Sequence, residues 1–272
     1  MQDLWWHTDG WQWHGLQWGS GSSLLICFHG FGEDAFRFEV LEKALGNDFT
    51  IVAVDLPFHG STRPVKETDM TPQPMLWRAC IQRVLEQFHQ PHFSLLGYSL
   101  GGRICLQLIQ QIPNRIKQLI LLAPDGLHHN CWFYFLTRTY VGQKLFRWHV
   151  DHPRMFFTIT KWLQSLHLLA PSFKKFLELQ MDTRAKRMQV WLSWNSLRYF
   201  IPDMKQVKKH LEQYQIPCYL FFGKYDRVIK PAYGKPFCKD LSRARMFVLD
   251  CGHQLLTAET ALVIKQQLDL HS

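Results

Sequence analysis

The sequence predicts an α/β protein with a mostly parallel, doubly wound sheet that a helical insertion interrupts. Short apolar runs rich in Val, Ile and Leu alternate with helix-type stretches, which is typical of parallel strands covered on both faces. This alternation stops after residue 126 and resumes at residue 201. The 272 residues, of which 47% are hydrophobic, suffice for one large domain with an insertion.

The chain opens with tryptophans on either side of Thr8-Asp9-Gly10, a pattern that predicts a hairpin. Near-continuous apolar runs then predict buried strands at 24–28, 50–56, 93–96, 116–122, 218–222 and 246–249. Apolar residues at helical spacing predict helices at 36–45, 74–88, 103–113, 204–214, 231–241 and 254–270. We therefore expect a core of residues 1–126 and 201–272, with residues 127–200 as the insertion.

The insertion is strongly basic, with eleven Lys or Arg and three acidic residues, whereas the rest of the chain carries a net charge of only +1. A basic segment favours an anionic substrate, a membrane surface or nucleic acid, but it is more often a solvated helical face. No nucleic-acid-binding signature accompanies the charge, so we expect no nucleic-acid partner. Peripheral contact with a membrane stays open as the less favoured interpretation.

Seven cysteines are scattered along the chain without a C-x-x-C pair, which indicates a reducing compartment and not a disulfide framework. The first residues lack a basic stretch followed by an apolar one, so no signal peptide is expected. No run of eighteen apolar residues is present. These features predict a cytoplasmic protein.

The most informative run is FSLLGYSLGGR, residues 93–103, in which an apolar strand meets a helix through Gly97-Tyr98-Ser99-Leu100-Gly101. A G-x-S-x-G between a strand and a helix is typical of a nucleophile elbow. The serine occupies a sharp turn, and small neighbours let the two backbones approach each other. Ser99 is therefore the predicted nucleophile.

A serine hydroxyl is a weak nucleophile near neutral pH and needs a base beside it. His29, His59 and His253 follow predicted strands and are the candidate bases. Asp226 and Asp125 also follow strands and are the candidate acids, whereas Asp55 and Asp250 are expected to form turns or caps.

Three features resemble the α/β-hydrolase superfamily: HGFG at residues 29–32, GYSLGG at 97–102, and an acid and then a histidine after the last two strands. The order Ser99, Asp226, His253 matches the order of the triad in that superfamily. The resemblance implies an oxyanion hole made by the backbone N–H groups of Phe31 and Leu100. It also implies that residues 127–200 form a cap, and that neither a cofactor nor a metal is needed.

The resemblance further implies a serine hydrolase that cleaves a carboxylic ester or a related acyl bond of a small molecule. The elbow and the LP-x-HG turn also resemble the menaquinone-pathway lyase family of SHCHC synthase, which carries Tyr and Arg at the positions of Tyr98 and Arg103. Such a lyase, or a carbon–carbon bond hydrolase on an anionic substrate, is the first alternative. A relative that only binds a ligand or partner is the second. Trp132 in the insertion either contacts an acyl group or packs the insertion.

Overall fold

The computed structural model describes residues 1–8, 10–66, 74–128, 131–155, 158, 162, 165 and 181–270. These residues group into two compact units. The first contains the described residues up to His128 and those from Phe200 onward. The second contains the described residues of 131–199.

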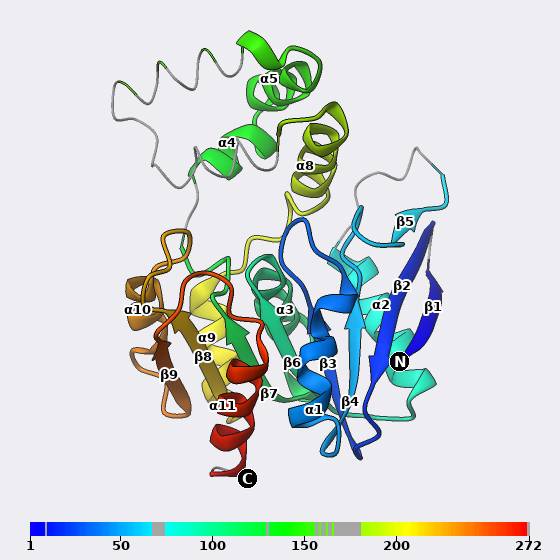
Figure 1. Cartoon of the computed structure of the whole chain (residues 1–272), viewed down its shortest axis with the longest axis vertical. Helices are drawn as coiled ribbons and strands as arrows, with labels where there is room; N and C mark the ends of the chain where they lie inside the picture. Colours follow the sequence, from blue (N-terminus) through cyan, green and yellow to red (C-terminus); the bar gives the residue numbers. More distant parts are fainter. Residues whose placement is uncertain are drawn as a thin grey trace. The chain divides into compact units, whose positions relative to one another are not determined.

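The first unit is built on one sheet with the strand order β1-β2-β4-β3-β6-β7-β8-β9, and the short β5 pairs with β2 (Figure 1). The six strands from β4 to β9 in this order are parallel, whereas β1 and β2 are antiparallel to their neighbours. The strand bounds are β1 Gln2–Thr8, β2 Trp11–Trp18, β3 Ser23–Phe28, β4 Phe49–Val54, β5 Arg63–Pro64, β6 Phe93–Tyr98, β7 Ile116–Leu122, β8 Cys218–Gly223 and β9 Ala244–Leu249. The predicted opening hairpin and the predicted mostly parallel sheet are confirmed.

Helices cover both faces of this sheet, which is why β6 and β8 are buried along their whole length and β3 is buried from Leu24 onward. On one face, α1 and α11 pack together; on the other, α3 packs against α9 (Figure 1). The helix bounds in this unit are α1 Glu42–Leu45, α2 Pro74–Gln87, α3 Leu100–Gln111, α9 Met204–Gln213, α10 Gly234–Cys238 and α11 Ala258–Asp269. Three 3-10 turns complete it, at Ala35–Leu41, Pro113–Arg115 and Pro231–Tyr233.

Four helices differ from the sequence prediction at their starts. The predicted helix 103–113 begins at Leu100 as α3, and the predicted helix 231–241 is a 3-10 turn over Pro231–Tyr233 before α10 begins at Gly234. The closing helix α11 begins at Ala258 and not at residue 254, because Thr257 caps it by accepting the Thr260 N–H through its hydroxyl. The predicted helix 36–45 is a 3-10 turn over its first part, and Asp34 caps that turn. The later start of α11 keeps His253 and Gln254 in a loop at the edge of the sheet.

The carboxyl ends of the parallel strands meet at one edge of the sheet, and a polar residue follows almost every one of them. These residues are His29 after β3, Asp55 after β4, Ser99 after β6, Asp125 after β7, Asp226 after β8 and His253 after β9. In open α/β sheets this edge is where ligands bind. The topology thus brings together side chains that are far apart in the sequence.

The second unit is helical, with α4 Cys131–Arg138, α5 Tyr140–Asp151 and α8 Arg184–Ser196 packed against one another. Arg187 is buried among them, where its guanidinium donates to the carbonyls of Val150 and Met181 at 2.9 and 3.0 Å. The prediction that residues 127–200 are a cap over the site stays a prediction. Among the helices that the structure describes in either unit, none has the length and apolar character needed to cross a membrane.

Candidate active site

Ser99 lies on the sharp turn between β6 and α3, with φ at 50° and ψ at −113°. A non-glycine residue at positive φ is strained, and the surrounding backbone must hold it there. The Ser99 N–H donates to the Leu122 carbonyl at 2.9 Å, and the Ser99 carbonyl accepts from the N–H groups of Gly102 and Asp125 at 3.0 and 2.8 Å. The turn is therefore fixed by the neighbouring strand β7.

Two glycines make this turn possible. A Cβ on Gly97 would lie 2.7 Å from the Cα of Gly102, and a Cβ on Gly101 would collide with the carbonyl of Phe28. Both positions are backbone crossings between a strand and α3, where a side chain has no room. The G-x-S-x-G pattern is thus explained by packing as well as by chemistry.

The imidazole of His253 lies between Ser99 and Asp226. Its Nε2 is 3.1 Å from the Ser99 Oγ, and its Nδ1 is 2.7 Å from the Asp226 Oδ2. The His253 side chain is 22% exposed, and the Asp226 side chain is completely buried. The three residues that the sequence singled out are thus hydrogen-bonded in one row.

Asp226 fixes the tautomer of His253. Its Oδ1 accepts the N–H groups of Val228 and Ile229 at 2.7 and 2.9 Å, and these bonds orient the carboxylate. Because this carboxylate can only accept from the imidazole, Nδ1 must carry the proton. Nε2 then presents its lone pair to the Ser99 hydroxyl, as a general base requires.

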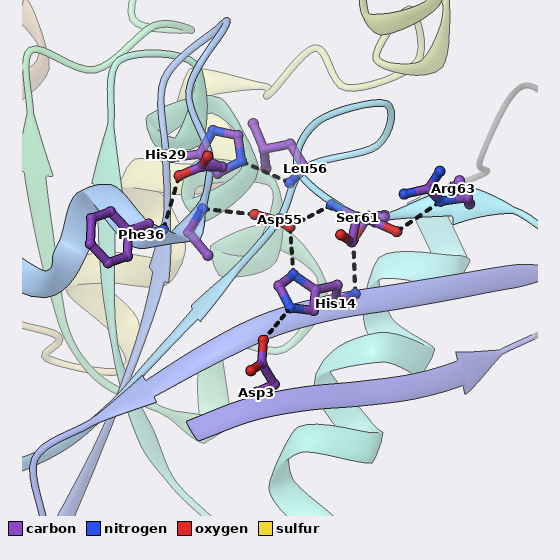
Figure 2. A network of polar contacts seen from close by, with 11 residues as sticks. Asp3, His14, His29, Phe36, Asp55, Leu56, Ser61 and Arg63 are labelled. Carbon is purple, nitrogen blue, oxygen red and sulfur yellow. Dashed lines mark hydrogen bonds and ion pairs between the residues drawn. The ribbon is translucent and has the colours of Figure 1, made fainter. Parts of the chain in front are cut away.

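A polar network around the buried Asp55 joins the loop after β3 to the loop after β4 (Figure 2). The Asp55 carboxylate accepts from Ala35 N–H at 2.7 Å and Ser61 N–H at 2.8 Å, and it bonds the His14 imidazole at 2.7 Å. Its expected role as a turn-forming residue is confirmed. The contact between Asp55 and His14 could not be predicted from the sequence, because His14 lies in a strand 41 residues earlier and belongs to no motif.

The other histidines near this edge are bonded to backbone. His29 Nε2 accepts from the Leu56 N–H at 3.0 Å, and Nδ1 donates to the Gly30 carbonyl at 2.7 Å. His59 Nδ1 donates to the Pro57 carbonyl at 3.0 Å. Burial lowers the pKa of His29 and of His59, so both stay neutral. His29 and His59 thus hold the loops that surround the serine.

The alternative acids have other partners. Asp125 pairs with the guanidinium of Arg103 at 2.7 Å, and Asp250 lies 3.6 Å from the Lys224 ammonium with a largely exposed side chain. Among the three aspartates, Asp226 is the one hydrogen-bonded to His253. The hydrogen bonds therefore agree with Asp226 as the predicted acid.

The predicted substrate contacts lie in different surroundings. Tyr98 is buried under the histidine, and its hydroxyl donates to the His253 carbonyl at 3.1 Å. Arg103 is buried on α3, where it forms the ion pair with Asp125. Trp132 belongs to α4, but its side chain is outside the described part of the structure. Contact of these three residues with a substrate stays a prediction.

The backbone N–H groups of Leu100 and Phe31 stay the predicted oxyanion donors. Leu100 is the first residue of α3, where backbone N–H groups point out of the helix and lack an acceptor within it. Phe31 lies in the turn after β3, and its ring contacts that of His59 edge-on at 5.4 Å between centroids. Across the described residues, no three His, Cys, Asp or Glu side chains gather in a way that could hold a metal ion.

Comparison with known proteins agrees with this fold. A family profile described as alpha/beta hydrolase fold matches residues 23–257. The chain belongs to the α/β-hydrolase family. The match begins at β3 and ends after the loop of His253, so it spans the elbow and both of its partners.

Several α/β hydrolases resemble the chain over most of its length. The uncharacterized hydrolase YugF of Bacillus subtilis is 24% identical and covers 91% of this chain and 89% of its own. The pimeloyl-(acyl-carrier protein) methyl ester esterase of Nitrosomonas europaea is 25% identical and covers 86% and 90%. Among solved structures, a thermophilic esterase from Thermogutta terrifontis superposes over all of both chains with a TM-score of 0.71 at 16% identity.

Proposed function

We propose that this α/β hydrolase is a serine hydrolase that cleaves a carboxylic ester of a small molecule through an acyl-enzyme. The observation that carries the proposal is the 3.1 Å contact between the His253 Nε2 and the Ser99 Oγ, with Asp226 bonded behind the ring. The esterase activities named for two relatives support an ester as the substrate.

In this mechanism the Ser99 oxygen attacks the ester carbonyl while its proton passes to the His253 Nε2. The buried Asp226 carboxylate stabilises the imidazolium that results. The N–H groups of Leu100 and Phe31 stabilise the negative charge on the carbonyl oxygen. His253 then gives its proton to the departing alcohol, and a water repeats the sequence to release the acid and regenerate the serine.

The lyase alternative needs a guanidinium that faces an anionic substrate. The ion pair between Arg103 and Asp125 already gives that guanidinium a carboxylate partner, which favours the ester hydrolase. Release of pyruvate from the menaquinone-pathway intermediate by the purified protein would reverse this preference.

A fluorophosphonate probe tests the proposal directly, because it phosphonylates only an activated serine. We expect labelling at Ser99, identified by peptide mapping, and its loss in Ser99→Ala. A folded wild-type protein that the probe leaves unlabelled would contradict the proposal and favour a protein that only binds a ligand. A panel of p-nitrophenyl esters of increasing acyl length then defines the substrate.

A further inference from the structure

A carboxylate that the proposed mechanism does not use, that of Glu33, connects the HGFG turn with the loop of His253. Its Oε2 accepts the Gly30 N–H at 3.2 Å, and its Oε1 accepts from the Arg37 Nε at 3.2 Å. Arg37 in turn donates from Nη2 to the Gln254 Oε1 at 3.2 Å. Because Gln254 follows His253 directly, three hydrogen bonds link the turn that carries Phe31 to the residue next to the predicted base.

Tyr98, the last residue of β6, contacts the same two loops. Its hydroxyl donates to the His253 carbonyl at 3.1 Å, and its ring lies 5.6 Å from the imidazole between centroids. A Cβ on Gly30 would be 3.1 Å from both the Glu33 Oε2 and the Tyr98 Cε1, so carboxylate and ring both flank Gly30. The HGFG turn, the elbow and the histidine loop therefore meet around this carboxylate.

The Glu33 side chain is only 16% exposed, and this burial raises its pKa above that of an ordinary glutamate. Arg37, the Gly30 N–H and the charge of His253 act in the opposite direction without cancelling the effect of burial. The charged and titratable groups that act on Glu33 are Arg37 and His253, and Tyr98 is subject to the charges of Glu33, Arg37, Asp226 and Cys251.

This environment has a consequence for stability. Since the pKa of Glu33 is raised on folding, the stability that its protonated form contributes is lost as the pH rises through that pKa. An ionised Glu33 near pH 8 therefore contributes less to the stability of the fold than a protonated one.

We propose that Glu33 is a positioning residue of the reaction, which holds the Gly30–Phe31 turn in place and, through Arg37 and Gln254, ties this turn to the loop of His253. The inference rests on the proposed function. The proton still moves from the Ser99 oxygen to the His253 Nε2 and on to the leaving alcohol, and Glu33 neither gains nor loses one. Glu33 acts through Gly30 and His253 and does not touch the substrate.

The test compares Glu33→Gln with Glu39→Gln, a control at an exposed position on the neighbouring 3-10 turn. Glu33→Gln should lower kcat for a p-nitrophenyl ester about tenfold with KM within about twofold, because a neutral amide oxygen holds Gly30 and Arg37 less strongly than a carboxylate does. The Tm at pH 8 should not fall below that of the wild type. Glu39→Gln should leave all three readouts unchanged.

Glu33→Asp separates charge from reach, because it keeps the carboxylate and withdraws it from Gly30. This variant should also lower kcat, with KM within about twofold of the wild type. A lower Tm in Glu33→Gln with kcat per labelled active site unchanged would show a purely structural role and overturn the inference. Wild-type kinetics in Glu33→Gln, with Ser99 still labelled by the fluorophosphonate, would overturn this inference alone. An unlabelled wild type would instead overturn the proposed function and this inference with it.

Discussion

The molecule contains two pairs of histidine and aspartate that are nearly identical in geometry. In each pair the imidazole Nδ1 lies 2.7 Å from an aspartate Oδ2: His253 with Asp226, and His14 with Asp55. Both aspartates are buried, and both accept two backbone N–H groups. The pairs differ in what the other ring nitrogen meets at 3.1 Å, which is the Ser99 hydroxyl in one case and the Asp3 carboxylate in the other.

This difference teaches that a pair of histidine and aspartate does not define an active site. A hydroxyl beside Nε2 can give up its proton and attack, whereas a carboxylate can only accept a hydrogen bond. The His14 pair therefore ties β1 and β2 to the loops after β3 and β4 (Figure 2). We expect substitutions in the His253 pair to affect activity and those in the His14 pair to affect stability.

The largest effect should come from removing each histidine. His253→Ala should lower kcat by roughly 10⁴- to 10⁶-fold, the range for a triad member that acts as the base, with little change in stability. His14→Ala should leave the kcat of the folded fraction within about twofold of wild type. It should lower the free energy of unfolding by about 3 kcal/mol, because the buried Asp55 loses its partner.

Ester kinetics and urea unfolding of both variants measure these effects. A loss of activity in folded His14→Ala that equals the loss in His253→Ala would break the comparison. A severe loss of stability in His253→Ala would also contradict the comparison.

Replacing each aspartate by asparagine should give a smaller contrast of the same kind. Asp226→Asn should reduce kcat roughly 10⁴-fold, because the amide favours the wrong tautomer of the imidazole. Asp55→Asn should reduce the urea midpoint while each folded molecule stays active. Active-site titration with the fluorophosphonate supplies the folded, competent concentration, so kcat is compared per active site. An unchanged kcat in Asp226→Asn would assign the role of the acid elsewhere.

A fall in pH should lower the stability of the loops around the His14–Asp55 pair. Burial lowers the pKa of His29 and of His59, so both are neutral in the folded state and take up protons on unfolding. Their contribution to stability is fully present above the pKa of an unfolded histidine, about 6.5, and is lost as the pH falls below it.

The free energy of unfolding should thus fall below about pH 6.5, by up to about 1.4 kcal/mol per pH unit for each histidine. Urea titrations between pH 8 and pH 5 measure the slope, and Ser99→Ala should give the same slope because the serine does not titrate there. A flat stability profile over this range would contradict the assignment of neutral, buried histidines.

The smallest effect should come from Asp3, which faces the Nε2 of His14 as Ser99 faces the Nε2 of His253. Its side chain is 67% exposed, so Asp3→Asn should lower the free energy of unfolding by about 0–1 kcal/mol, and less at high salt. Ser99→Ala, by contrast, should abolish ester cleavage. Urea unfolding at low and high ionic strength checks the first prediction. A loss above about 2 kcal/mol would mean that Asp3 does far more than an exposed ion pair allows.

The sequence was sufficient for the sheet, the elbow and the choice of Ser99, because these follow from local patterns. The apolar runs mark buried strands, and the glycines around Ser99 mark a place where two backbones cross. The starts of helices were less well predicted. Apolar spacing continues from residue 254 into α11, and nothing in it reveals that Thr257 rather than an earlier residue caps the helix.

The sequence does not predict which side chains far apart along the chain pair with each other. Asp125 and Asp226 both follow a parallel strand, and their partners distinguish them: Asp125 pairs with Arg103, whereas Asp226 bonds His253. No motif marks His14 or Glu33, since a lone histidine in a strand and an acid after a glycine turn are common. The role of each depends on one partner, Asp55 for His14 and Gly30 for Glu33. The folded loops place these partners.

The hydrogen bond between His253 and Ser99 joins positions 154 residues apart, and β7, β8 and β9 must all dock in register before it can form. Under the proposed function, a nascent or cleaved chain that lacks β9 and the loop of His253 has Ser99 without its base. Return of ester cleavage after dilution from denaturant should then come later than the recovery of helical signal or tryptophan fluorescence. Ester cleavage would thereby serve as an assay for completion of the native topology.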